Sequence, residues 1–206
     1  YGVHICNYLK LLVISIIMNT RPVILPNESY IDNDKITHLT KLIQQLVDTV
    51  DIKSFGVDVG MVNKGYNIGW YSTIVMPFEH EDTFYVKYPE LHDAAQEVLA
   101  FAKTMNGIDR IAINTLAPVS LLPLHYDNES DEDDKILIPH YNLLVPLTDG
   151  GHSIVNDRLY ENYYGVPIIF DPQSHHGAIN SSEEWRMNYF VKVKNEAFHE
   201  FNSNKF

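Results

Sequence analysis

His125 and Asp127 stand two residues apart in the segment Leu122-Pro123-Leu124-His125-Tyr126-Asp127. On a β-strand, residues two apart leave the same face, so this imidazole and this carboxylate can converge on one cation. Two imidazoles and one carboxylate on one face of a transition metal leave coordination positions open for other molecules. A plainer interpretation also fits the pair, in which a strand-end histidine precedes an aspartate that begins a turn.

A third metal ligand is offered by His175 or His176, which follow the apolar segment Val166-Pro167-Ile168-Ile169-Phe170. Successive residues of a strand face opposite ways, so only one of the two histidines is expected to point at a metal. The local pattern leaves the choice between them open.

Arg186 lies ten residues after His176, with the turn-forming segment Asn180-Ser181-Ser182 between them. A hairpin about residue 181 would set the two side chains on neighbouring strands, where cross-strand Cβ atoms are roughly 5 Å apart. A guanidinium there suits the far carboxylate of a dicarboxylic acid, which it can bind with two parallel hydrogen bonds. The alternative is an exposed hairpin arginine paired with Glu183 or Glu184.

Two amphipathic helices are predicted before these residues. Apolar positions from Ile36 to Val50 recur with helical spacing, and Asn33 or Asp34 can cap the start. The segment from Leu91 to Ala102 repeats the pattern and is followed by Gly107. Between the helices, the segment 66–78 is rich in aromatic and β-branched residues and is expected to form one or two strands.

After Gly107 the pattern becomes that of short strands separated by turns. The strand-like segments are Arg110 to Asn114, Leu121 to Tyr126, Ile136 to Leu147, His152 to Val155, Arg158 to Tyr164, Val166 to Phe170, His176 to Asn180 and Trp185 to Lys194. This number of strands predicts a mainly β fold with flanking helices, a double-stranded β-helix (jelly roll, cupin-like) or a related sandwich. We expect residues 1–20 to be a leader or non-native segment and residues 21–206 to be a single domain, with its jelly-roll core at 108–195.

The net charge of −12 and the pI near 5.1 provide no basic surface for nucleic acid, so we expect no nucleic-acid partner. The acidic stretch from Asp127 to Asp134 is expected to be a solvated loop. A single cysteine excludes an internal disulfide and suits a reducing cytoplasm. The apolar run from Leu11 to Met18 is far shorter than the roughly 20 residues that span a bilayer, so no membrane partner is expected.

From about Pro118 to Val193 the chain resembles the aspartyl/asparaginyl β-hydroxylase branch of the Fe(II) and 2-oxoglutarate dependent oxygenases. The most specific match runs through Ile169-Phe170-Asp171, His176, Asn180 and Arg186, and Pro123-Leu124-His125 resembles the block of the first metal histidine. The resemblance selects His176 over His175 and assigns Arg186 to the C5 carboxylate of 2-oxoglutarate. The segment from Pro139 to Pro146 resembles the strand where a histidine helps to bind the co-substrate, which makes His140 a further candidate.

The resemblance thus implies Fe(II) on His125, Asp127 and His176, with 2-oxoglutarate and O2 as co-substrates. The implied reaction hydroxylates an unactivated C–H bond of an amino acid, free or in a peptide. Well-studied members of the branch have a small residue at the position of Asp127, and an arginine where this chain has Ile138. Two alternatives stay open: a non-catalytic jelly-roll binding protein, and a cupin-type metalloenzyme without 2-oxoglutarate that takes a further metal ligand near His140.

Overall fold

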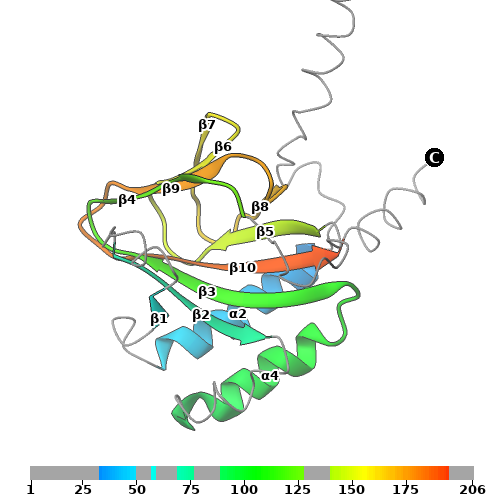
Figure 1. Ribbon diagram of the computed structural model, residues 1–206. Coiled ribbons are helices and arrows are strands. Elements are labelled where there is room, and N and C mark those ends of the chain that lie inside the picture. The colour runs from blue at the N-terminus through cyan, green and yellow to red at the C-terminus, as the bar shows by residue number, and fades with distance from the viewer. Residues whose placement is uncertain (1–32, 50–56, 59–68, 77–88, 128–139, 195–206) are drawn as a thin grey trace, which may run out of the picture.

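Two β-sheets face each other, and two α-helices cover the outer side of the larger sheet (Figure 1). The computed structural model describes residues 33–49, 57–58, 69–76, 89–127 and 140–194. The expected leader at 1–20, the acidic loop after Asp127 and parts of the segment 66–78 lie outside the described residues.

The strands form one six-stranded and one four-stranded sheet, and every paired strand is antiparallel to its neighbour. The larger sheet has the order β1 (Val57–Asp58), β2 (Trp70–Met76), β3 (Ile108–Leu116), β10 (Arg186–Lys194), β5 (His140–Pro146) and β8 (Ile168–Phe170). The smaller sheet has the order β4 (Ser120–His125), β9 (His176–Asn180), β6 (His152–Val155) and β7 (Arg158–Glu161).

The strand order is that of a jelly roll, because the chain passes back and forth between the two sheets from β3 to β10. The predicted fold class is therefore confirmed. The eight strand segments predicted after Gly107 correspond to β3 through β10, and β6 and β9 have the predicted bounds. These strands could be predicted from the sequence because side chains alternate between the two faces of a strand.

The predicted hairpin between His176 and Arg186 is wrong. Strand β9 pairs with β4 and β6, whereas β10 lies between β3 and β5 in the other sheet, so the chain crosses between sheets after Asn180. The Asn180 side chain fixes this crossing, because its Nδ2 donates to the carbonyl oxygens of Leu116 (3.1 Å), Ala117 (2.9 Å) and Glu184 (2.8 Å). A turn-forming residue thus stabilises a connection between sheets instead of a hairpin.

The two predicted helices are α2 (Asn33–Asp48) and α4 (His92–Ala102), the latter preceded by the short 3-10 helix η5 (Pro89–Leu91). Their apolar faces form one hydrophobic core with the outer face of the larger sheet, where Tyr189 of β10 is fully buried. Tyr189 shares a hydrogen bond of 3.0 Å with Thr40 of α2. Because strand residues alternate, Arg186 and Lys192 point the other way, into the space between the sheets.

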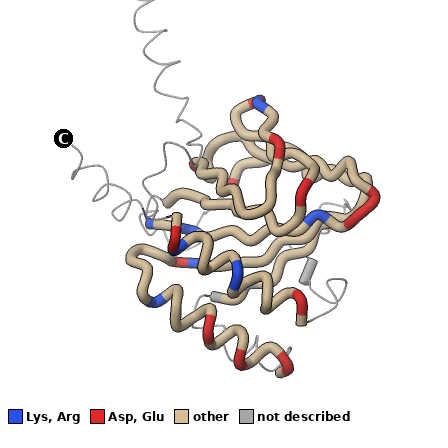
Figure 2. The backbone as a smooth tube through the Cα atoms, turned by 180° about the vertical axis from the view of Figure 1, so that it is seen from behind, with Lys and Arg blue, Asp and Glu red and all other residues tan. Residues whose placement is uncertain are grey.

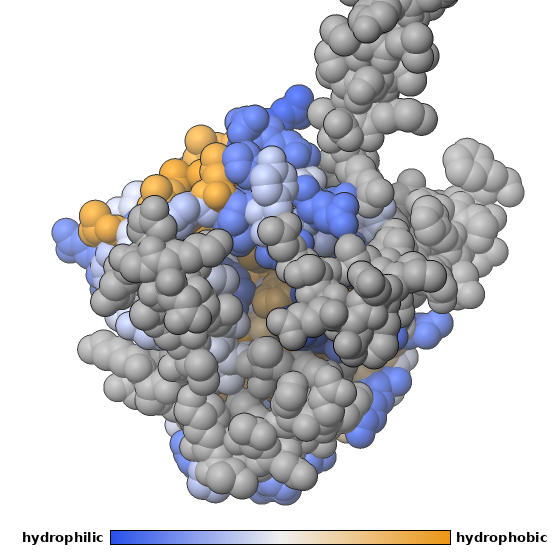
Figure 3. Space-filling model, in the orientation of Figure 1, coloured by the Kyte–Doolittle hydropathy of each residue, from blue (hydrophilic) through white to orange (hydrophobic). Residues whose placement is uncertain are grey.

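The outer face of the smaller sheet carries no helix from the described part of the chain (Figure 1). Figure 3 shows an apolar patch over β4 and β9, and Leu121 and Leu124 are exposed there. Acidic residues, red in Figure 2, recur along α4 and the short helix that precedes it. No helix of the described residues combines the length and hydropathy needed to cross a membrane.

Candidate metal and carboxylate site

A β-bulge in β4 sets the position of His125. Leu122 pairs with Ala178 and His125 pairs with His176, so three steps along β4 match two steps along β9. Pro123 falls in the bulge, where its missing N–H removes no ladder hydrogen bond. Gly177 makes the close approach possible, since a Cβ there would lie 2.8 Å from the Leu122 carbonyl oxygen. The bulge therefore brings the two imidazoles opposite each other.

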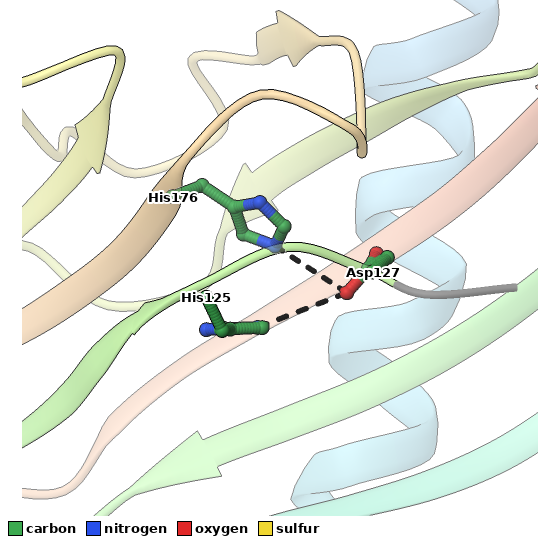
Figure 4. A group of neighbouring side chains, drawn as sticks. All are labelled: His125, Asp127 and His176. Carbon is green, nitrogen blue, oxygen red and sulfur yellow. Dashed lines mark ion pairs between the residues drawn. The ribbon is translucent and has the colours of Figure 1, made fainter.

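His125, Asp127 and His176 converge at the same end of the smaller sheet (Figure 4). One ligand atom from each residue lies within 4.8 Å of the other two. Asp127 Oδ1 is 3.7 Å from Nε2 of His125 and 3.5 Å from Nε2 of His176. No further His, Cys, Asp or Glu joins this group among the described residues.

Both imidazoles are oriented by backbone carbonyl oxygens. Nδ1 of His125 lies 2.8 Å from the oxygen of Pro123, and Nδ1 of His176 lies 2.8 Å from the oxygen of Ser174. A carbonyl oxygen only accepts, so each Nδ1 carries the proton and each Nε2 presents its lone pair in the neutral ring. Metal-binding histidines in proteins are held in this way.

The carboxylate of Asp127 is held ionised in the same place. Burial alone would raise its pKa, but the nearby imidazoles of His176 and His125 and the hydrogen bond from Asn142 together lower the pKa of Asp127 to about 2. Nδ2 of Asn142 donates to Asp127 Oδ2 at 3.1 Å, which leaves Oδ1 facing the imidazoles. Asn142 therefore contributes to the lowered pKa of Asp127 and fixes the direction of this carboxylate.

The donor set fits a divalent metal. Each Nε2 lies 3.5–3.7 Å from Asp127 Oδ1, which is longer than an N–H···O hydrogen bond, and the three ligand atoms lie within 4.8 Å of one another. Three electron-rich atoms repel one another unless a cation lies between them, and metal bonds of about 2 Å place ligand atoms roughly 3–4 Å apart. The rings of Trp70 and Phe170 flank the imidazoles, with centroids 6.2 Å from His125 and 5.0 Å from His176.

Arg186 reaches the same interior from the larger sheet. Its side chain is 2% exposed, so it is not the exposed arginine of the alternative interpretation. Nη2 of Arg186 donates to Ser153 Oγ across the barrel at 3.0 Å. Ser153 pairs with Ala178, which is two residues from His176 on the same face of β9, a separation of roughly 7 Å along a strand.

Neutral groups alone surround this guanidinium in the described part of the chain. Because arginine only donates, the amide oxygen of Asn162 faces it and accepts from Nε at 2.8 Å, while the Asn162 amide nitrogen donates to Ser153 Oγ at 3.0 Å. Gly151 makes room, since a Cβ there would lie 3.1 Å from Arg186 Cδ. Burial lowers the pKa of Arg186 to about 10, which leaves it cationic at neutral pH. A buried cation with no anionic partner is costly, so the place suits an anion.

The other predicted residues lie apart from this group. His175 faces away from the trio and stacks on Tyr126, with ring centroids 4.6 Å apart. His140 begins β5, two residues before Asn142 on the same strand face, so it lies towards the metal end of the interior and not beside Arg186. Its assignment to 2-oxoglutarate stays a prediction.

Sequence reasoning missed three residues that orient the site: Asn142, Ser153 and Asn162. Asn142 had a usable signal, because its spacing of two from His140 places it on the same strand face. Ser153 and Asn162 had none, since only the packing of the two sheets brings them to Arg186.

No protein-family model matches the chain, and no curated protein matches it in sequence. Solved structures resemble the chain at low identity and with TM-scores below 0.5. A 2OG-Fe(II) oxygenase family oxidoreductase from Burkholderia pseudomallei is 16% identical, with 76% of this chain and 78% of that chain covered and a TM-score of 0.45. The viral collagen prolyl hydroxylase of Paramecium Bursaria Chlorella virus-1, solved with 2OG, is 16% identical over 80% and 91% of the two chains, with a TM-score of 0.41. A Cupin 2 conserved barrel domain protein from Salinispora arenicola is 12% identical over 67% and 87%, with a TM-score of 0.38.

Proposed function

We propose that this protein is an Fe(II) and 2-oxoglutarate dependent dioxygenase that hydroxylates a C–H bond of an amino acid. One observation carries the proposal. Arg186 is buried and has no anionic partner among the described residues. It donates to Ser153, which pairs with Ala178, two residues along β9 from His176 of the three converging metal ligands. A metal alone explains His125, Asp127 and His176, but it does not explain Arg186.

The separation along β9 between His176 and Ala178, which pairs with the Arg186 partner Ser153, is roughly 7 Å and suits a five-carbon dicarboxylate. One carboxylate would take the Nη1 donors of Arg186, which the hydrogen bonds to Ser153 and Asn162 leave available. The 2-oxo acid end would then lie at the metal, beside His176. His140 would approach only that end, since it lies beyond Asn142 on β5.

When bound, iron, 2-oxoglutarate and dioxygen supply the oxidation of C–H to C–OH, with succinate and carbon dioxide as the other products. The residues of this chain hold and orient these molecules. His125, Asp127 and His176 form the metal face, Asn142 aims Asp127, and Arg186 fixes the far end of the co-substrate. The rings of Trp70 and Phe170 lie beside the two imidazoles.

The two alternatives lack a specific supporting observation. A cupin-type enzyme without 2-oxoglutarate calls for a further metal ligand near His140, and none joins the trio among the described residues. A non-catalytic binding protein predicts Arg186 far from the histidines, whereas Arg186 reaches the strand beside His176. The aspartyl/asparaginyl type of substrate stays part of the proposal on the sequence resemblance.

The test is an anaerobic titration of the protein with Fe(II) and then 2-oxoglutarate, followed by the visible metal-to-ligand charge-transfer band. We expect the band in the wild type, its loss in His176→Ala, and its retention in His175→Ala. The second variant is a matched control, because His175 is the adjacent residue and stacks on Tyr126 instead. A folded, metal-loaded protein without the band would refute the 2-oxoglutarate proposal.

A further inference from the structure

Two asparagine side chains lie side by side on the inner face of the larger sheet. Asn188 of β10 pairs with Asn114 of β3, and Asn114 pairs with Ser72 of β2 on its other side. Their chain neighbours Tyr189 and Ile113 pack into the helix-covered core, so the two asparagines face the space between the sheets. We name Ser72, Asn114 and Asn188 the amide row.

The amide row lies beside both parts of the proposed site. Trp70 and Arg186 both pair with Leu116 and form the neighbouring row of the same strand face, two residues away. Two residues span roughly 7 Å along a strand. The ring centroid of Trp70 is 6.2 Å from that of His125, and Arg186 donates to Ser153 across the barrel. A molecule bound next to the metal trio can therefore reach the amide row.

The amide oxygens of this row lack hydrogen-bond donors. Oδ1 of Asn114 and Oδ1 of Asn188 are buried and have no partner among the described residues, and Asn188 as a whole is 5% exposed. On the other side of Asn188 lies Pro146, whose side chain has no donor, and Arg186 donates to Ser153 instead. Buried polar groups in folded proteins are almost always paired with protein or water. A ligand that displaces water from this row must supply donors of its own.

The charges nearby narrow the kind of ligand group. A carboxylate has only acceptor oxygens, so it would leave both Oδ1 atoms without a donor. An ammonium group has donors, but the cationic Arg186 comes from the neighbouring row of the same face. A neutral amide avoids both conflicts, because it carries an N–H donor and a carbonyl acceptor. The two asparagines offer the matching acceptor and donor on strands about 4.8 Å apart.

We infer that the amide row binds a neutral amide group of the substrate. The amide N–H donates to Oδ1 of one asparagine, and the amide carbonyl accepts from Nδ2 of the other. A side-chain carboxamide and a main-chain peptide group share this chemistry, and the experiment separates these two sources. The inference rests on the proposed function and narrows its substrate class, since acidic side chains are expected to bind poorly at this row.

The experiment is isothermal calorimetry of the full chain, loaded anaerobically with Fe(II) and 2-oxoglutarate. L-asparagine and L-glutamine offer a side-chain carboxamide, and N-acetylglycine N-methylamide offers only main-chain amides. Their counterparts without the amide N–H are L-aspartate, L-glutamate and N-acetylglycine methyl ester. We expect at least one amide to bind, and its counterpart to bind about 10- to 100-fold more weakly. Absence of binding by all three amides, or equal binding of the counterparts, would overturn the inference.

Two variants assign the amide to the row. Asn188→Leu and Asn114→Leu keep the size of the side chain and are each expected to weaken the amide ligand about 10- to 100-fold. Each removes a buried oxygen without a donor, so the urea midpoint of the unliganded protein should not fall. Thr115→Val is the matched control, because Thr115 has a buried Oγ1 without a described partner but faces the helices, where it pairs with Met187. Wild-type affinity in both leucine variants would overturn the inference.

A titration of 2-oxoglutarate into the same variants separates a substrate site from a co-substrate site. Unchanged 2-oxoglutarate affinity in Asn188→Leu supports the inference. A loss of 2-oxoglutarate affinity equal to that of the amide ligand would overturn it, since the row would then hold the co-substrate. A normal charge-transfer band without amide binding refutes this inference alone, whereas a missing band refutes the oxygenase proposal, so the two failures are distinguishable.

Discussion

Replacing Arg186 by Met is expected to have opposite effects on the unliganded and the liganded protein. Without ligand, the guanidinium is buried and has only Ser153 and Asn162 as partners in the described structure. Removing a buried charge without an anionic partner removes a desolvation penalty of several kcal/mol. The two polar partners can still bond to each other at 3.0 Å. We therefore expect unliganded Arg186→Met to be at least as stable as the wild type.

The affinity for 2-oxoglutarate is expected to fall strongly in the same variant. Two charge-assisted hydrogen bonds from the guanidinium fork are worth about 1.5–3 kcal/mol each, so their loss weakens binding roughly 100-fold or more. At 100 times its Kd, 2-oxoglutarate stabilises the wild type by about 2.7 kcal/mol, and Arg186→Met loses this gain at the same concentration. Arg186→Lys keeps the charge without the fork, so its loss should be intermediate.

The assay is thermal unfolding with and without 2-oxoglutarate, in the presence of a divalent metal, together with the charge-transfer titration. Arg158→Met is the control, because Arg158 is an exposed arginine on β7. Suppose unliganded Arg186→Met is less stable by more than about 2 kcal/mol and binds 2-oxoglutarate normally. Arg186 would then be a structural residue, and the reasoning from its missing anionic partner would be refuted.

Three further predictions concern two residues at the site and one in the helix-covered core. Asn142→Leu should weaken metal binding about 10-fold or more, measured by competition with a chelator, because Asp127 loses the donor that aims it; unchanged affinity would contradict this. Gly177→Ala should cost about 1–3 kcal/mol in urea unfolding and weaken metal binding, because its Cβ would press on the Leu122 carbonyl oxygen, and wild-type stability would contradict the tight bulge. Burial raises the pKa of Tyr189 above its ordinary value, so above about pH 10 the unfolded chain loses this proton first and stability falls as pH rises; Tyr189→Phe should flatten that fall between pH 8 and 10.5 in urea unfolding, and an unchanged slope would contradict it.

Local pattern was sufficient for the two α-helices and for the strands from β3 to β10, whereas the short β1 and η5 were not predicted. The helical spacing from Ile36 and from Leu91 predicted α2 and α4, and alternation with turn residues predicted the strands of the jelly roll. These signals are local, because each depends only on residues one or two turns or strand steps apart. The same rule placed His125 and Asp127 on one face, and they converge as expected.

The positions of residues across the barrel were not predictable in this way. The spacing of ten residues between His176 and Arg186 suggested a hairpin, but the two strands lie in different sheets. Arg186 still reaches the interior because it faces inward from the opposite sheet and bonds to Ser153. A hairpin and a crossing between sheets both need a short segment of turn-forming residues, so the local sequence does not distinguish them. The packing of the whole barrel decides which of the two forms.

By itself, the sequence determined the strand periodicity, the two helices and the shared face of His125 and Asp127, because these follow from backbone geometry over a few residues. The tertiary structure decided which histidine joins them, since the pairing of β4 and β9 turns His176 inward and His175 onto Tyr126. It also decided the neutral surroundings of Arg186 and the contact of Asn142 with Asp127. Those contacts join residues far apart in the chain, and their register is set by the packing of two sheets that no local pattern records.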